Sequence, residues 1–246
     1  MTLTAIIGGT GLNHIPELED KLELSVATEL GEVNVVKATW QGCPVVFLAR
    51  HGNPHKIPPH KINYRANLLA LEQLNVTQII AVNAVGGIHE AMGPETICLP
   101  DQIIDYTHGR EATFFDGEFR ALDHIDFSHP YSSAMREKLL MASQIANIDV
   151  FSQGVYGATQ GPRLETAAEI RSMREDGCDV VGMTGMPEAA LARELNIPYA
   201  SVCLIVNWGA GMTQTPITMN EIKAVLESGM HRVRNLVQTF LSMSLH

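Results

Sequence analysis

The chain has 246 residues, of which 46% are hydrophobic and 18% are charged, a balance typical of a folded globular protein and not of a disordered one. The formal net charge of −10 argues against nucleic-acid binding, because that function normally requires a basic surface. An anionic ligand would have to be held by a few locally placed cations and backbone N–H groups.

The cysteines and the apolar stretches indicate the cellular compartment of the protein. Four cysteines are far apart and form no C-x-x-C pair, which favours buried reduced thiols over a disulfide framework or a zinc knuckle. No apolar stretch reaches the roughly 20 residues that a membrane helix needs, and Thr4–Ile7 enter a strand-like run without a basic leader. We therefore expect a cytoplasmic protein with no membrane partner.

Short apolar runs rich in β-branched residues recur along the chain and end at glycine or polar residues, as buried strands do. They are Ala5–Gly8, Pro44–Ala49, Gln78–Val85, Asp179–Met183 and Tyr199–Val206. Helical patterns lie between them, at Tyr64–Leu74, Ser133–Ala146, Thr166–Glu175, Pro187–Leu195 and Met219–Leu245. This alternation predicts an α/β fold with a mainly parallel sheet. Since no linker rich in Pro, Gly or Ser divides the chain, we expect one domain over residues 1–246.

Ligands of parallel sheets gather at the carboxyl ends of strands, so the residues that follow the apolar runs are the candidates for a site. The first group is Gly8–Gly11 (GGTG), whose N–H groups and Thr10 hydroxyl can bind an anion. It matches neither a dinucleotide fingerprint nor a P-loop, and a plain turn is the alternative. The second is Arg50 beside His51, where a planar fork of donors suits phosphate; a surface ion pair is the alternative.

Three histidines, His51, His55 and His60, have a spacing that could suggest a metal. The prolines between them preclude a regular helix, and carboxylates are missing nearby. We predict no metal site there, because ligand spacing needs a supporting scaffold.

Further polar residues follow the later runs. Asn83 precedes a small residue and two glycines, Glu165 stands where a helix begins, and Thr184 offers a hydroxyl after a strand. Asn207 presents both a donor and an acceptor that can read a purine edge, although turn formation also explains it. With no Ser/His/Asp nucleophile arrangement, these residues favour positioning of substrates over covalent attack. Asp101–Tyr131, polar and aromatic, is expected to be a long loop that carries function or contacts a neighbouring subunit.

Together these motifs resemble the trimeric purine nucleoside phosphorylase and methylthioadenosine phosphorylase superfamily. The resemblance runs from Ile6–Leu12 to the C-terminal helix and includes Leu48–Gly52, Asn63–Asn67, Gly161–Arg163 and Met183–Ala189. It implies a single domain with a twisted mixed central β-sheet flanked by helices, assembled as a homotrimer. It also implies an enzyme that breaks the bond between a purine and its ribose with inorganic phosphate as co-substrate, without a metal or an organic cofactor.

The resemblance also implies roles for individual residues. Phosphate would be bound by Thr10, Arg50, His51, Asn83 and Thr184. The purine and ribose would be surrounded by Ala84, Leu164, Glu165, Met183, Asn207, Trp208 and Gly209. His124 would reach the 5′ pocket of the adjacent subunit, and Asn63–Arg65 have no role beyond scaffolding. Catalysis would be electrostatic: the phosphate anion, held by Arg50 and His51, stabilises a cationic sugar, and Asn207 stabilises charge developing on the purine.

The base is expected to be a 6-oxopurine. Glu165 and Asn207 match the pair that 6-oxopurine phosphorylases use, whereas members that cleave methylthioadenosine carry aspartates at Asn207–Gly209. A carboxylate can accept the N1–H of hypoxanthine, but it would be left unpaired by adenine, which has a lone pair there.

The 5′ end of the sugar is expected to carry a methylthio group. Met219 stands where inosine phosphorylases place a histidine for the 5′-hydroxyl, and Ile222 lies one turn further on the same face. An apolar pocket would leave a hydroxyl unsatisfied, although core packing is the alternative for both residues. The prediction is therefore 5′-methylthioinosine, giving hypoxanthine and 5-methylthioribose 1-phosphate. The alternatives are a methylthioadenosine or a general inosine/guanosine phosphorylase, a related hydrolase, and a non-catalytic nucleotide-binding module.

Overall fold

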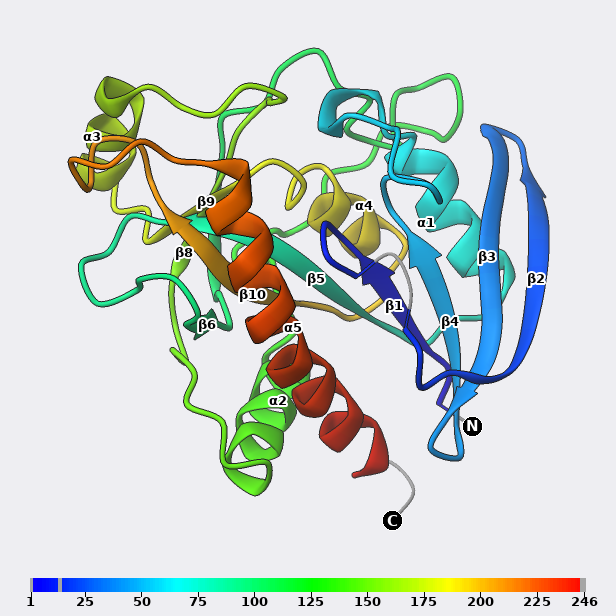
Figure 1. The fold of residues 1–246 in the computed structure, drawn as a ribbon. Helices are drawn as coiled ribbons and strands as arrows, with labels where there is room; N and C mark the ends of the chain where they lie inside the picture. The colour runs from blue at the N-terminus through cyan, green and yellow to red at the C-terminus, as the bar shows by residue number, and fades with distance from the viewer. Residues whose placement is uncertain (1, 13–14, 244–246) are drawn as a thin grey trace.

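The computed structural model describes residues 2–12 and 15–243 (Figure 1). The strands in this part of the chain are β1 (Thr4–Gly8), β2 (Glu19–Thr28), β3 (Gly31–Trp40), β4 (Cys43–Ala49), β5 (Gln78–Gly87), β6 (Ile97–Cys98), β7 (Gln102–Asp105), β8 (Val155–Ala158), β9 (Val180–Gly182) and β10 (Tyr199–Trp208). The helices are the 3-10 helix η1 (Pro59–Lys61) and α1 (Tyr64–Gln73), α2 (Ser133–Ile145), α3 (Ala167–Glu175), α4 (Glu188–Glu194) and α5 (Met219–Ser242).

All the strands belong to one mixed sheet with the order β2-β3-β4-β1-β5-β9-β8-β7, and β10 pairs with β5 and β6. Strands β4, β1, β5 and β10 run parallel, as do β7, β8 and β9, whereas β2, β3 and β4 are antiparallel neighbours. The predicted α/β domain with a mixed sheet is confirmed.

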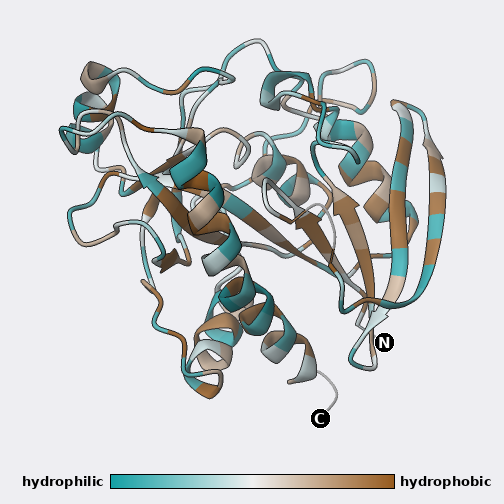
Figure 2. Ribbon diagram, viewed as in Figure 1, coloured by the Kyte–Doolittle hydropathy of each residue, from teal (hydrophilic) through white to brown (hydrophobic). Residues whose placement is uncertain are grey.

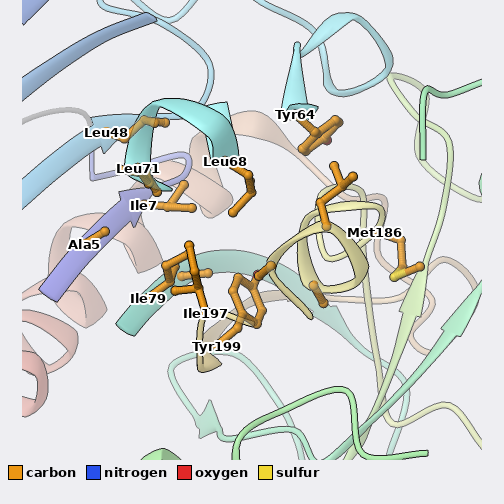
Figure 3. Close-up of a cluster of buried hydrophobic side chains, with 14 of the residues drawn as sticks. Ala5, Ile7, Leu48, Tyr64, Leu68, Leu71, Ile79, Met186, Ile197 and Tyr199 are labelled. Atoms are coloured by element: carbon orange, nitrogen blue, oxygen red, sulfur yellow. The ribbon is translucent and has the colours of Figure 1, made fainter. Parts of the chain in front are cut away.

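Helices cover both faces of the sheet, and each face has its own apolar core. Alternate residues of β1 show this: Ile7 packs in the cluster that includes α1 and α4, and Ile6 in the cluster that includes α2 and α5. Figure 3 shows part of the first cluster, where Ile7, Ile79 and Tyr199 lie among side chains of α1 and the α4 region. Because the central strands are covered on both sides, they read in the sequence as continuous apolar runs.

The predicted elements are present, and within the described residues their ends agree or differ by one or two residues. Strand β5 continues to Gly87 and β10 to Trp208, beyond the predicted ends, and α4 begins after Pro187. Thr166, predicted as the first residue of its helix, instead caps α3 in a capping box with Glu169. Helix α5 is described to Ser242, so its predicted end at Leu245 lies outside the described residues.

The β2–β3 hairpin was not predicted from the apolar runs. Most of β2 is exposed, and Figure 2 shows hydrophilic and hydrophobic residues alternating along both strands, so no continuous apolar run marks them. Strands β6, β7 and β8 have two to four residues each, and they were not predicted because such short segments give no recognisable apolar run. Strand β7 lies inside Asp101–Tyr131, whose remainder is irregular as expected. Among the described residues, no helix is long and apolar enough to span a bilayer.

Candidate active site

The site begins where β1 and β4 end side by side. Gly8 is paired with Ala49, and the Arg50 N–H donates to the Gly8 carbonyl at 3.0 Å. A Cβ atom on Gly9 would lie 2.7 Å from the Val82 carbonyl oxygen and 3.0 Å from Arg50 Nη1. Only glycine therefore lets the turn that carries Thr10 approach both β5 and the guanidinium.

Arg50 is 1% exposed and forms a two-pronged ion pair with Glu188. Its Nε donates to Oε2 of Glu188 at 2.6 Å and its Nη2 to Oε1 at 2.7 Å, and the Tyr199 hydroxyl donates to Oε1 at 2.9 Å. Burial acts to lower the pKa of Arg50, but the adjacent Glu188 carboxylate more than offsets this and raises it. The guanidinium is therefore a permanent, rigidly held cation.

Asn83 and Thr184 meet because β9 runs antiparallel to the end of β5 and returns the chain toward the middle of that strand. The Thr184 hydroxyl donates to Asn83 Oδ1 at 2.9 Å, and Asn83 Nδ2 donates to the Ser201 hydroxyl at 2.7 Å. Arg50 Nη1 donates to the carbonyl of Val82, next to Asn83, at 3.3 Å. The Asn83 amide thus connects the end of β9 to β10.

His51 is also held in one orientation. Its Nδ1 lies 2.8 Å from the Ile57 carbonyl oxygen, which can only accept, and its ring stacks on that of His55 with centroids 4.3 Å apart. Burial lowers the pKa of His51 to about 4, with Arg50 and His55 acting in the same direction. The neutral ring donates through Nδ1, so Nε2 is an acceptor, whereas the sequence suggested a donor.

Glu165 lies on the loop between β8 and α3. The Thr159 hydroxyl donates to Glu165 Oε1 at 2.6 Å, which fixes one carboxylate oxygen and leaves the other. Both residues line a cavity of about 470 Å³ together with Tyr106 and His108. Leu164, beside Glu165, is 44% exposed.

The other residues assigned to the purine lie around the ends of β5 and β9. Asn207 follows an irregularity in the pairing of β10 with β5, and its Nδ2 donates to the Trp208 carbonyl at 2.7 Å. That amide nitrogen lies 3.4 Å from the position of a Cβ on Gly86. Ala84 is half-buried in β5, and Gly209 N–H donates to the Gly87 carbonyl at 2.8 Å.

The residues assigned to the 5′ end of the sugar differ in their position and in their exposure to solvent. Met219 is the first residue of α5 and is 61% exposed, whereas Ile222 is 7% exposed and belongs to the core between α5 and the sheet. His124 is exposed in the long loop before α2. In this single chain the three side chains do not form one pocket with Glu165.

Arg110 is a residue of the site region that the sequence did not single out. From the long loop it donates to the backbone carbonyls of Thr159, Gln160, Met183 and Met186, the Gln160 side chain and the Tyr64 hydroxyl. It thereby joins the ends of β8 and β9. A lone arginine in an irregular segment carries no sequence signal. Glu188 lies within the Met183–Ala189 motif, but neither it nor Thr159 or Tyr199 was assigned a role from the sequence.

Asn63 and Arg65 make contacts that join α1 to its surroundings. Asn63 caps α1 by accepting from Ala66 N–H, and Arg65 forms ion pairs with Glu111 and Asp116 of the long loop. In the part of the chain that the structure describes, no group of three or more His, Cys, Asp and Glu side chains is arranged to hold a metal.

Comparison with known proteins identifies the family to which this chain belongs. The chain matches the Phosphorylase superfamily over residues 4–242. It is 50% identical to a probable S-methyl-5′-thioinosine phosphorylase of Pseudomonas syringae pv. tomato (99% of this chain, 100% of that protein). It is 43% identical to a 6-oxopurine nucleoside phosphorylase of Pyrococcus furiosus (96% and 91%).

The structure of a methylthioadenosine phosphorylase from Schistosoma mansoni in complex with adenine superposes with a TM-score of 0.93 at 28% identity, covering 99% of this chain and 92% of the other. Sequence and fold agree over nearly the whole length. The chain belongs to the Phosphorylase superfamily and is an enzyme of the nucleoside phosphorylase kind.

Proposed function

We propose that this enzyme cleaves 5′-methylthioinosine with inorganic phosphate, giving hypoxanthine and 5-methylthioribose 1-phosphate. The observation that carries the proposal is the close approach of the Gly8–Thr10 turn, the buried Arg50 and the hydrogen-bonded Asn83–Thr184 pair, where β1 and β4 end beside β5. Such convergence of donors is what an oxyanion requires.

In this proposal Thr10, Arg50, His51, Asn83 and Thr184 hold phosphate on one side of the sugar. The anion stabilises the positive charge that develops on the ribose as the bond to the purine breaks. Asn207 then donates to the purine where negative charge develops. No metal and no organic cofactor takes part, because the charges that must be stabilised are met by phosphate and by side-chain donors.

Glu165 selects the base. Thr159 donates to one oxygen of its carboxylate at 2.6 Å, so the other is left to accept the N1–H of a 6-oxopurine. The names of the similar bacterial and archaeal proteins, S-methyl-5′-thioinosine and 6-oxopurine nucleoside phosphorylases, support this choice. An adenine base offers no proton there, and the half-buried carboxylate would lose its partner.

The 5′ pocket is shared between subunits of a homotrimer, with Met219 from one subunit and His124 from its neighbour. Support comes from the exposure of Met219, Leu164 and Leu122, three apolar side chains at 61%, 44% and 72%. A neighbouring subunit and a methylthio group would cover such surface. The four free, buried cysteines favour a reducing compartment, the cytoplasm.

The test compares 5′-methylthioinosine, 5′-methylthioadenosine and inosine as substrates, with and without phosphate. We expect cleavage only with phosphate, and the highest kcat/KM for 5′-methylthioinosine. A preference for methylthioadenosine would contradict the role of Glu165, and a preference for inosine would contradict the apolar 5′ pocket. Turnover without phosphate would identify a hydrolase, and an unchanged rate in Arg50→Ala would contradict the whole site.

A further inference from the structure

Helix α4 begins with a carboxylate that has no access to solvent. Glu188 is 0% exposed and accepts three hydrogen bonds, two from Arg50 and one from the Tyr199 hydroxyl. Figure 3 shows Tyr199 among the apolar side chains of this face of the sheet. Replacing a buried ion pair with apolar residues often leaves a fold as stable or more so, so stability alone does not account for the pair.

Glu188 determines which edge of the Arg50 guanidinium is left for a ligand. A guanidinium has five N–H donors, and Glu188 occupies the Nε and one Nη2 donor. Nη1 donates to the Val82 carbonyl at 3.3 Å and lies against Gly9. Among the described residues no other partner of these nitrogens is seen, so one donor on each Nη is left for a ligand, and Nη1 is the one that adjoins Gly9 of the Gly8–Thr10 turn.

The ion pair also changes how an anion can be bound. Arg50 and Glu188 carry opposite charges at a separation of 2.6 Å, so together they contribute no net charge to the site. Phosphate must then be held by the direction of the donors and not by excess positive charge. The direction of the Arg50 donors is what the two-pronged contact with Glu188 fixes.

We propose that Glu188 is a positioning residue for phosphate, acting through Arg50 and itself held by the Tyr199 hydroxyl. The inference rests on the proposed phosphate site and adds to it a residue that does not touch the substrate. It accounts for a carboxylate buried behind an anion site, where its own charge would otherwise disfavour the ligand.

The test is the Glu188→Gln variant, measured by the KM for phosphate, the KM for the nucleoside and the calorimetric Kd for phosphate alone. Glutamine keeps the shape but turns an N–H group toward a donor of Arg50, so the fork is broken. We expect the phosphate KM and Kd to rise about tenfold or more, as loss of a charged hydrogen bond predicts. The nucleoside KM should change less than about threefold, because the purine contacts do not involve Arg50.

Glu194→Gln is the matched control, because it makes the same change on the same helix. Glu194 is 9% exposed and accepts at 2.6 Å from both the Thr113 hydroxyl and the Phe114 N–H, remote from Arg50. The Glu194→Gln substitution should lower the melting temperature without raising the phosphate KM. If Glu188→Gln does not fold, Tyr199→Phe carries the test, with a smaller rise in phosphate Kd of about threefold.

The inference is overturned if a folded variant binds phosphate as the wild type does, if both KM values rise together, or if Glu194→Gln raises the phosphate KM equally. A failure of the proposed function is a separate result. The wild type would then bind phosphate without cleaving any of the three nucleosides, and the calorimetric Kd of the variant would still decide the role of Glu188. A wild type that does not bind phosphate at all would overturn both.

Discussion

Thr159 illustrates how one hydroxyl can set the chemistry of a neighbouring group. It lies 2.6 Å from Glu165 Oε1 and 3.3 Å from the Gly182 carbonyl, so its proton goes to the carboxylate. We predict that Thr159→Val lowers kcat/KM for the 6-oxopurine nucleoside roughly tenfold, mainly through the nucleoside KM. Thr159→Ser, which keeps the hydroxyl, should restore most of the loss. Equal activity of the Thr159→Val and wild-type enzymes would show that Glu165 does not need the hydrogen bond from the Thr159 hydroxyl.

His51 predicts a pH dependence of stability. Burial lowers its folded pKa from 6.5 to about 4, so between these values the unfolded chain binds a proton that the folded chain does not. Its contribution is therefore complete above pH 6.5 and is lost as the pH falls toward 4, at a cost of up to about 3 kcal/mol.

The measurement is urea unfolding of the wild type and of His51→Asn across this window. Asparagine can still donate to the Ile57 carbonyl but does not titrate, so the difference between the two free energies of unfolding should shrink or reverse as the pH falls. Carboxylates common to both proteins cancel in the difference. Parallel curves would contradict the shifted pKa.

At the level of elements, the turn after β1 depends on close approach to β5. Gly9→Ala would place a methyl group 2.7 Å from the Val82 carbonyl oxygen, and a backbone atom cannot move aside as a side chain can. We predict a loss of about 1–3 kcal/mol in stability and an increase of about tenfold or more in the phosphate KM, because Thr10 moves with the turn.

Gly177→Ala serves as the control for this prediction. Gly177 has a φ of +93° and no heavy atom within 4 Å of an added Cβ, so the change costs backbone strain without a clash. It should lower stability by about 1 kcal/mol and leave the phosphate KM unchanged. A Gly9→Ala enzyme with the wild-type phosphate KM would show that the turn does not position Thr10.

Elements were predictable from the sequence where burial on both faces left a continuous apolar run, as in β1 and β5. The β2–β3 hairpin was not, since its exposed residues such as Lys21 and Glu23 interrupt the pattern. Candidate site residues that follow strands could be proposed from the sequence, because glycines and small polar residues mark the ends of apolar runs. Partners that come from elsewhere, such as Glu188 and Arg110, could not, because their proximity to Arg50 and to Thr159 exists only in the folded chain.

For the whole molecule, we predict that each active site contains residues of two subunits. Arg50→Ala and His124→Ala, each inactive or weakly active alone, should regain phosphorolysis when the two proteins are unfolded and refolded together. Mixed trimers would contain sites with an intact Arg50 and a neighbour's intact His124. Light scattering should give a mass three times that of the 26.9 kDa chain. A monomer, or a mixture no more active than its components, would contradict the shared site.

In the proposed site Thr10, Arg50, His51 and Thr184 bind a single oxyanion beside the base. A crystal structure of the enzyme with phosphate and hypoxanthine tests this arrangement most directly. We predict phosphate within hydrogen-bond distance of Thr10, Arg50, His51 and Thr184, with a phosphate O–H donating to His51 Nε2, and hypoxanthine N1 facing Glu165. Phosphate bound elsewhere, with these side chains directed at other partners, would contradict the account.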